Sequence, residues 1–257
     1  MTDLVSVIIP TFNSAKTIRR ALNSVIRQAY KNWEVIIIDS NSNDKTLSLV
    51  KLYKSKKIKV YQISKSKGLA AARYCGIQKS KGKLLAFLDS DDEWHNKSKL
   101  SKQVFFHTNT NIKFSCTAYN LINMKKKKMS INQNLDRFDF NYLLSNRPIA
   151  LSTVMIQKKF ALKKFKKYLY NEYAEDYLWW LVALKEINYC YILKQNLSNI
   201  YLADNNRSMN IVKNYKSLYK IYKNNFYLSN YSILLIFIKL ILNTLNKNIF
   251  KFRSFFA

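Results

Sequence analysis

Residues 84–92 read Leu84-Leu85-Ala86-Phe87-Leu88-Asp89-Ser90-Asp91-Asp92, an unbroken apolar run followed by three acids within four positions. Acids are scarce in this chain, which has 44 Lys and Arg residues against 15 Asp and Glu residues. A short apolar run bounded by polar residues predicts a buried strand. Ligands of open α/β sheets gather at the carboxyl ends of such strands, so the acids after Leu88 are the first candidates for a binding site.

Crowded carboxylates of this kind repel one another unless a cation lies among them. Their oxygen atoms suit Mg²⁺ or Mn²⁺, ions that usually share their coordination with substrate phosphates. The stretch therefore predicts a site for a metal ion and a diphosphate. The alternative is structural, because an Asp-rich loop after a strand often only caps the next helix, a role that Asn96 or Ser98 could also fill.

Length and composition limit the classes of protein that fit. A chain of 257 residues with 48% hydrophobic residues can bury a substantial core, which excludes wholesale disorder. The formal net charge of +29 favours anionic partners, namely nucleotides, nucleic acid or an acidic membrane face. Three widely separated cysteines without a Cys-x-x-Cys pair indicate neither a disulfide framework nor a zinc site. The first residues lack a basic segment and a long apolar one, so a cytoplasmic protein is expected.

The N-terminal half alternates between strand-like and helix-like patterns. Apolar runs predict strands at 4–10, 34–39, 58–63 and 84–89, and the intervening periodicity predicts helices at 18–29, 45–54 and 69–78. This alternation predicts an α/β fold with a mostly parallel sheet and crossover helices.

The C-terminal half does not continue this regular alternation. Strands are expected at 113–119, 151–156, 189–193 and 198–202, and helices at 138–144 and 175–186. A Lys-, Asn- and Tyr-rich helical tail follows. It ends in an apolar run from Ser232 to Leu242 that is shorter than the roughly 18–20 residues needed to cross a bilayer and is interrupted by Lys239. Either a helix lying on an anionic membrane or a helix packed on the protein itself or another subunit explains this pattern.

Polar groups follow three of the predicted strands in register. Thr11 and Asn13 follow the first strand, Asp39 ends the second, and the acidic stretch follows the fourth. The small-residue helix from Gly68 to Gly76 lies between the last two, and its Arg73 could pair with the acids or bind nucleotide phosphates. A nucleotide lying across these strand ends is therefore expected. The two histidines, His95 and His107, have no partner spacing for a metal and are expected at the surface.

Four motifs in this order resemble those of family-2 inverting glycosyltransferases of the bacterial surface-glycan type, which have the GT-A fold. The motifs are Val7-Ile8-Ile9-Pro10-Thr11-Phe12-Asn13, Ile38-Asp39-Ser40-Asn41-Ser42-Asn43-Asp44-Lys45-Thr46, Gly68 through Gly76, and Phe87-Leu88-Asp89-Ser90-Asp91-Asp92-Glu93-Trp94. The resemblance covers residues 4–94. It implies a Rossmann-like, mostly parallel sheet flanked by helices, here with a C-terminal helical extension. Ser40, Asn41, Ser66 and Tyr74 depart from the family's usual residues.

The resemblance also implies roles for individual residues. Asp39 would bind the nucleotide base, and Asp91 and Asp89 would hold Mn²⁺ or Mg²⁺. Asp92 would either contact the donor sugar or hold in place the residues that contact the ligands. The residues implied in binding the nucleotide are Pro10, Thr11, Asn13, Asp39, Gly68, Arg73, Asp89 and Ser90. In a later segment that often carries a metal-binding His, Asp204 could serve as a ligand instead, and Arg207 could hold the diphosphate.

The matching catalytic base would be Asp176, with Glu175 beside it, in the stretch Ala174-Glu175-Asp176-Tyr177-Leu178-Trp179-Trp180. Such a base takes the proton of the attacking acceptor hydroxyl. Carboxylates at a helix N-terminus are also favourable with the helix dipole alone, which is the structural alternative.

The resulting expectation is a metal-dependent inverting glycosyltransferase that uses a nucleotide-sugar, expected to be a UDP-sugar. Its acceptor would belong to lipopolysaccharide, capsule or a lipid-linked glycan, at the inner face of the cytoplasmic membrane. Residues 1–110 would form the nucleotide-binding half, 111–210 the acceptor half and 211–257 a basic helical tail. The alternatives are a nucleotidyltransferase, which usually needs a Gly-rich phosphate loop that 11–16 lacks, and a nucleic-acid-binding protein, whose phosphates the acids would repel.

Overall fold

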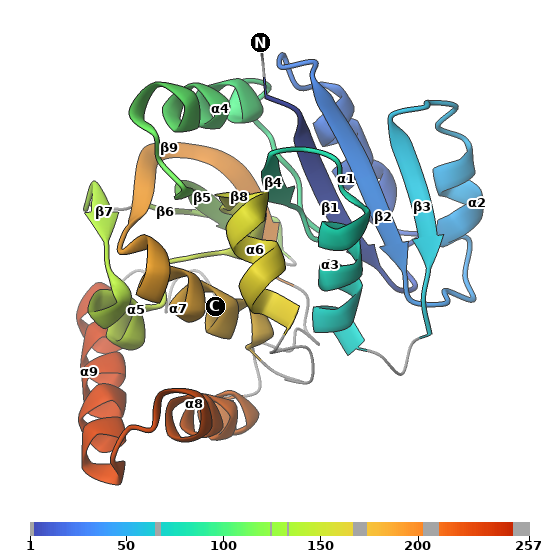
Figure 1. Ribbon diagram of the computed structural model, residues 1–257. Coiled ribbons are helices and arrows are strands. Elements are labelled where there is room, and N and C mark those ends of the chain that lie inside the picture. Colours follow the sequence, from blue (N-terminus) through green and yellow to red (C-terminus); the bar gives the residue numbers. More distant parts are fainter. Residues whose placement is uncertain are drawn as a thin grey trace.

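The computed structural model describes residues 3–64, 68–123, 125–132, 134–166, 174–202 and 211–248 (Figure 1). Within these ranges the strands form one nine-stranded sheet in the order β3-β2-β1-β4-β8-β5-β9-β7, with β6 paired to β5. Helices cover both faces of the sheet. The expected mixed α/β architecture, with a central, mostly parallel sheet flanked by helices, is confirmed.

The N-terminal half has the predicted alternation. Its strands are β1 (Val5–Thr11), β2 (Trp33–Asp39), β3 (Ile58–Gln62) and β4 (Leu84–Phe87), and its first helices are α1 (Ile18–Ile26), α2 (Thr46–Lys51) and α3 (Gly68–Lys79). All pairings among these four strands are parallel. Every residue of β1, β2 and β4 is buried, which explains why their sequences are continuous apolar runs.

Alternate residues of β1 point to opposite faces of the sheet and join different cores. Val7 and Ile9 pack with α1 and with α4 (Lys99–Thr110) on one face. Ile8 packs on the other face, against α3. Gly76 of α3 is needed there, since a Cβ at that position would lie 2.5 Å from Ile8 Cγ2. The small residues of α3 therefore let the helix approach the sheet closely, as expected.

The C-terminal half joins the sheet through antiparallel pairs. Strand β8 (Met155–Gln157) lies between β4 and β5 (Phe114–Ile122) and is antiparallel to both. Strand β9 (Cys190–Tyr201) is parallel to β5, and the outer strands are β6 (Lys128–Ile131) and β7 (Arg137–Phe138). The helices are α5 (Phe140–Asn146), α6 (Lys158–Phe165) and α7 (Glu175–Ile187).

Three expectations were wrong in detail. The predicted strand 151–156 begins as a short 3-10 helix, Leu151–Thr153, and only its end belongs to β8. The two predicted strands after residue 189 are one strand, β9. His107 is buried on α4, with Nε2 2.8 Å from the Ser115 hydroxyl, so it is not a surface residue.

The helical C-terminal extension is confirmed by α8 (Ile211–Phe226) and α9 (Asn230–Asn248). Ile233 and Leu240 of α9 and Tyr222 of α8 belong to the same buried core as α7. The hydroxyls of Tyr222 and Tyr177 lie 2.8 Å apart in that core. Among the described residues, no helix combines the length and apolarity needed to span a bilayer. The domain limits at 110 and 210 stay predictions.

Candidate active site

The end of β2 holds Asp39 in a fixed position. Asp39 is directly opposite Thr11 in the β1–β2 register, and Thr11 Oγ1 donates to Asp39 Oδ1 over 3.0 Å. Ser42 donates twice, from its amide to Oδ2 over 2.9 Å and from its hydroxyl to Oδ1 over 2.6 Å. A carboxylate has about four acceptor positions, and these donors occupy three of them. Asp39 is buried.

Asn13 joins the turns after β1 and β2. Its amide donates to Ser42 Oγ over 2.9 Å, and its side-chain Oδ1 accepts from the Asn43 amide over 3.0 Å. Its φ of 48° is left-handed, a conformation that Asn tolerates better than most residues. Pro10, opposite Ile38, precedes this turn within β1. The predicted nucleotide-binding residues at the end of β1 and in the turn after it thus lie in the loop beside Asp39.

Arg73 brings three distant parts of the chain together. From α3 it donates to Asp89 Oδ1 over 2.7 Å, just after β4, and to Glu175 Oε1 at the start of α7. The Arg73 side chain is buried. Burial alone would lower the pKa of Arg73, but the charges of Asp89 and Glu175 outweigh it and raise that pKa, so the guanidinium stays charged. Of the two alternatives for Arg73, the structure shows the pairing with the acids.

The remaining residues of the acidic motif differ in their surroundings. Ser90 Oγ lies 2.8 Å from Ser14 Oγ. Burial, reinforced by the charge of Asp89, raises the pKa of Asp91 to about 6. Asp92 is buried, where it accepts from Ser152 Oγ over 2.5 Å and from the Tyr201 amide over 3.0 Å. Burial and then the charges of Asp91 and Asp89 raise the pKa of Asp92 well above its ordinary value. Contact of Asp92 with a donor sugar stays a prediction.

A divalent cation fits this end of β4 by the chemistry of its donors. Asp89 and Asp91 supply hard oxygen ligands. Burial, and then the charge of Asp89, raise the pKa of Asp91, and a cation at this position would favour the charged carboxylate. Within the described ranges, no three His, Cys, Asp or Glu side chains are grouped to hold a metal ion. Other ligands would therefore come from the substrate phosphates. Asp204 and Arg207 lie outside the described residues, and Gly68, with φ of 75°, begins α3.

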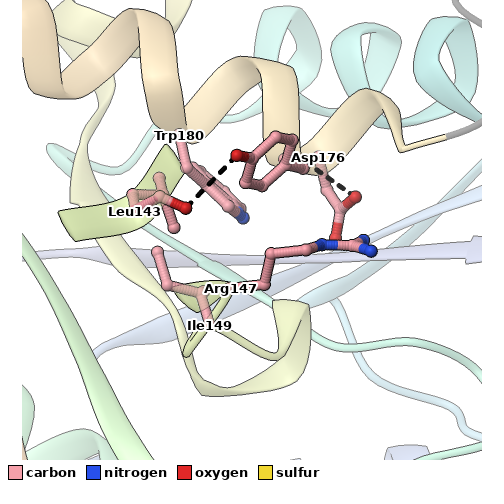
Figure 2. Close-up of a pocket in the computed structure, with 6 residues that line it drawn as sticks. Leu143, Arg147, Ile149, Asp176 and Trp180 are labelled. Carbon is pink, nitrogen blue, oxygen red and sulfur yellow. Dashed lines mark hydrogen bonds between the residues drawn. The ribbon is translucent and has the colours of Figure 1, made fainter. Parts of the chain in front are cut away.

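Glu175 and Asp176 are neighbours with different environments. Glu175 is buried and paired with Arg73; burial raises the pKa of Glu175 although the Arg73 charge opposes this. Asp176 is half-buried and lines a cavity of about 280 Å³ (Figure 2). Its Oδ1 accepts from the Tyr177 amide over 2.8 Å. Of the pair, Asp176 is the carboxylate that a molecule in the cavity can reach.

The cavity beside Asp176 is formed by α5, the loop after it and α7. Besides Asp176 its lining residues are Leu143, Arg147, Ile149, Tyr177 and Trp180. The Tyr177 hydroxyl donates to the Leu143 carbonyl over 3.2 Å, which joins the two helices. Its wall combines apolar and aromatic side chains with the charged groups of Asp176 and Arg147. Trp180 lines this cavity, whereas Trp179 stacks on Phe165 in the core with ring centroids 4.5 Å apart.

Sequence reasoning missed three residues of this region. Arg20 of α1 stacks on the Tyr201 ring, 3.5 Å from its centroid, and donates to the Asp91 carbonyl. Ser152 donates to Asp92 and accepts from the Asp89 amide over 3.0 Å. Arg147 lines the cavity. No local pattern marks Arg20 or Ser152, because each contacts residues far away in the sequence.

Comparisons with known proteins agree with this geometry. The family model Glycosyl transferase family 2 matches residues 6–169. The chain is 34% identical over 187 residues to the Escherichia coli UDP-Glc:alpha-D-GlcNAc-diphosphoundecaprenol beta-1,3-glucosyltransferase WfgD, covering 72% of this chain and 71% of WfgD. It is 31% identical over 229 residues to the putative teichuronic acid biosynthesis glycosyltransferase TuaG of Bacillus subtilis strain 168, covering 86% and 87% of the two chains.

Among solved structures, S. aureus TarS 1-349 in complex with UDP-GlcNAc aligns with a TM-score of 0.74. The alignment covers 94% of this chain and 72% of that chain at 21% sequence identity. That likeness supports the GT-A fold expected from the motifs. On the family match and the two curated relatives, this chain belongs to glycosyl transferase family 2.

Proposed function

We propose that this enzyme is an inverting glycosyltransferase that moves a sugar from a UDP-sugar to a hydroxyl of a bacterial surface glycan. UDP is proposed because WfgD is named for a UDP-Glc donor and TarS was solved with UDP-GlcNAc. The proposed acceptor is lipid-linked, as the diphosphoundecaprenol in the name of WfgD suggests, and it would belong to lipopolysaccharide, capsule or a related polymer. Such an acceptor would be met at the inner face of the cytoplasmic membrane.

The observation that carries the proposal is the link made by Arg73. This one buried side chain pairs with Asp89 at the end of β4 and with Glu175, the residue before Asp176. Asp39 ends β2, two strands away from β4 in the same sheet. A donor lying across the strand ends would thus have its diphosphate near Asp89 and its sugar toward the cavity of Asp176. Residues 1–110 would hold the donor and 111–210 the acceptor.

Asp176 is the proposed base. It would accept the proton of the acceptor hydroxyl as the oxygen attacks the anomeric carbon of the donor, while the bond from that carbon to the diphosphate oxygen breaks. A single in-line displacement inverts the anomeric configuration. Asp39 would accept from the uracil N3–H, and Glu175 would orient the start of α7 through Arg73. Held by Asp89 and Asp91, Mn²⁺ or Mg²⁺ would supply Lewis-acid stabilisation of the leaving diphosphate.

The Asp176→Asn variant tests the assignment of the base. Transfer from a UDP-sugar to a diphosphate-lipid acceptor is expected to slow by roughly 10²–10⁴-fold, because the amide cannot take the proton. UDP affinity, measured by calorimetry with Mn²⁺ present, is expected to stay near that of the wild type. The matched control is Asp136→Asn, at a surface carboxylate remote from the strand ends, which is expected to leave both quantities unchanged.

Two results would refute the proposal. If Asp176→Asn transferred sugar at the wild-type rate, Asp176 would not be the base. A product whose anomeric configuration equals that of the donor, as read by NMR, would remove the single displacement. Asp91→Asn separates the donor site from the base, since it is expected to weaken UDP binding only when Mn²⁺ or Mg²⁺ is present.

A further inference from the structure

The last helix, α9, is apolar on two opposite sides. Ile233 and Leu240 face inward and are buried in the core shared with α5 and α7. The opposite side is exposed, and it consists of a stripe of six residues, here called the outer stripe: Tyr231, Leu234, Leu235, Ile238, Ile241 and Leu242. Their spacing by three and four positions places them on one face of the helix. Packing against the protein itself therefore explains only half of this helix.

Helix α8, which precedes α9, carries a row of positive charge. Four exposed lysines, here called the lysine row, recur at helical spacing along one side of that helix: Lys213, Lys216, Lys220 and Lys223. The two features meet at Asn230, the first residue of α9, whose Oδ1 accepts from Lys223 Nζ and from the Tyr219 hydroxyl, both over 3.2 Å. Figure 1 shows α8 and α9 together at the end of the molecule opposite α4.

The turn between the two helices is also suited to an interface of water and lipid. Tyr227, in this turn, is 87% exposed, and Tyr231 at the start of the outer stripe is 71% exposed. Tyrosine is favoured at membrane surfaces because its ring is apolar and its hydroxyl is polar. A helix with an apolar face, flanking lysines and too little length to cross a bilayer fits the surface of a membrane.

We propose that the outer stripe and the lysine row together bind the surface of an anionic phospholipid membrane. The stripe would enter the boundary between headgroups and acyl chains, and the lysines would contact phosphate groups. Charge complementarity favours lipid over a second copy of the chain. Residues 211–248 contain no Asp or Glu, so a second copy would bring lysines against lysines with no acid to pair with them. The stripe is also wider than the two positions per heptad of a coiled-coil seam.

The test is flotation of the whole chain with vesicles of phosphatidylcholine, with and without phosphatidylglycerol. Binding to the anionic vesicles is expected, and it should weaken as salt rises. Replacing the four residues of the lysine row with Gln is expected to weaken binding on the order of 10²–10³-fold, at about one kcal/mol per lysine. The triple variant Leu234→Ser, Ile238→Ser, Leu242→Ser is expected to abolish it.

Matched control variants remove the same number of lysines, or of exposed apolar residues, from other parts of the surface. One control replaces four exposed lysines far from α8 with Gln, namely Lys51, Lys54, Lys56 and Lys81. The other replaces three exposed apolar residues elsewhere with Ser, namely Leu52, Val60 and Phe105. Both controls are expected to bind vesicles as the wild type does.

The proposal fails if the wild type does not float with anionic vesicles, or if the two α8–α9 variants bind as their controls do. It also fails if light scattering shows a dimer that the triple variant dissociates while vesicles are not bound, since a second copy would then cover the stripe. Hydrolysis of the donor in vesicle-free buffer is read in parallel. Under the proposed function it depends on the strand ends and α7 and not on α8 or α9. Loss of hydrolysis in the wild type would therefore count against the proposed reaction, and loss of flotation alone would count against the membrane surface.

Discussion

Arg73 is the residue on which the site depends most directly. Its guanidinium is buried between Asp89 and Glu175, so removing it leaves buried negative charge without a partner. Arg73→Leu is expected to lower the free energy of unfolding by about 3–5 kcal/mol, as measured by urea denaturation. Arg73→Leu combined with Glu175→Gln is expected to be less destabilised than the single variant, because one of the two charges is gone. A double variant no more stable than the single one would contradict this account of the pair.

Glu34 makes the stability of the fold depend on pH. Its carboxylate accepts from Lys59 Nζ over 2.7 Å, from Ser6 Oγ over 2.7 Å and from the Lys81 amide over 2.6 Å. Burial alone would raise the pKa of Glu34, but these hydrogen bonds outweigh it and lower that pKa below the ordinary 4.5. The stabilisation by Glu34 is therefore present above about pH 4.5 and lost as the pH falls through the lowered pKa.

Glu34→Gln is accordingly expected to destabilise the protein at pH 7, and the difference from the wild type should shrink as the pH falls below 4.5. Urea unfolding at several pH values measures it. Glu186→Gln is the matched control, because Glu186 pairs with Lys164 at a third of full exposure on both sides, where ion pairs contribute little. A Glu34→Gln difference that stays constant from pH 7 into this acidic range would refute the assignment.

At the scale of elements, the contact between α3 and β1 sets how closely Arg73 approaches the strand ends. Gly76→Ala would place a Cβ 2.5 Å from Ile8 Cγ2, so the helix or the strand must shift. We expect a loss of about 1–3 kcal/mol in the free energy of unfolding. The cost of Gly76→Ala should fall in an Ile8→Ala background, where that methyl group is absent. Equal costs in the two backgrounds, measured by a double-mutant cycle, would show that the contact is not the cause.

The elements that could be predicted well from the sequence are those that are buried along their whole length. The strands β1, β2 and β4 are buried on both faces, so their sequences are continuous apolar runs. Strand β9 was predicted as two pieces because Lys194 and Gln195 are exposed in its middle. The register against β5 shifts at Thr117 and Ala118, which is how one strand accommodates that polar interruption.

The candidate site likewise contains contacts that could be predicted from the sequence and contacts that could not. The acids after β4 and the pairing of Arg73 with acids could be predicted, because each belongs to a short motif. That Glu175 is the second partner of Arg73 could not, since the two are 102 positions apart. Ser152 lies in a stretch that resembles a strand, yet it sits in a 3-10 helix that directs its hydroxyl to Asp92. Contacts of this kind depend on the assembled sheet and leave no local pattern.

At the scale of the whole molecule, the position of β8 has a consequence for folding. Strand β4 is hydrogen-bonded on one side to β1 and on the other to residues 155–157, which are made long after it. A nascent chain that ended near residue 110 would carry β4 as a bare edge, open to pairing with other chains. In the half proposed to hold the nucleotide, β4 would then form its second strand pairing only after the following half has emerged from the ribosome. The two halves have different proposed roles, one for the donor and one for the acceptor, but they would complete folding as one unit.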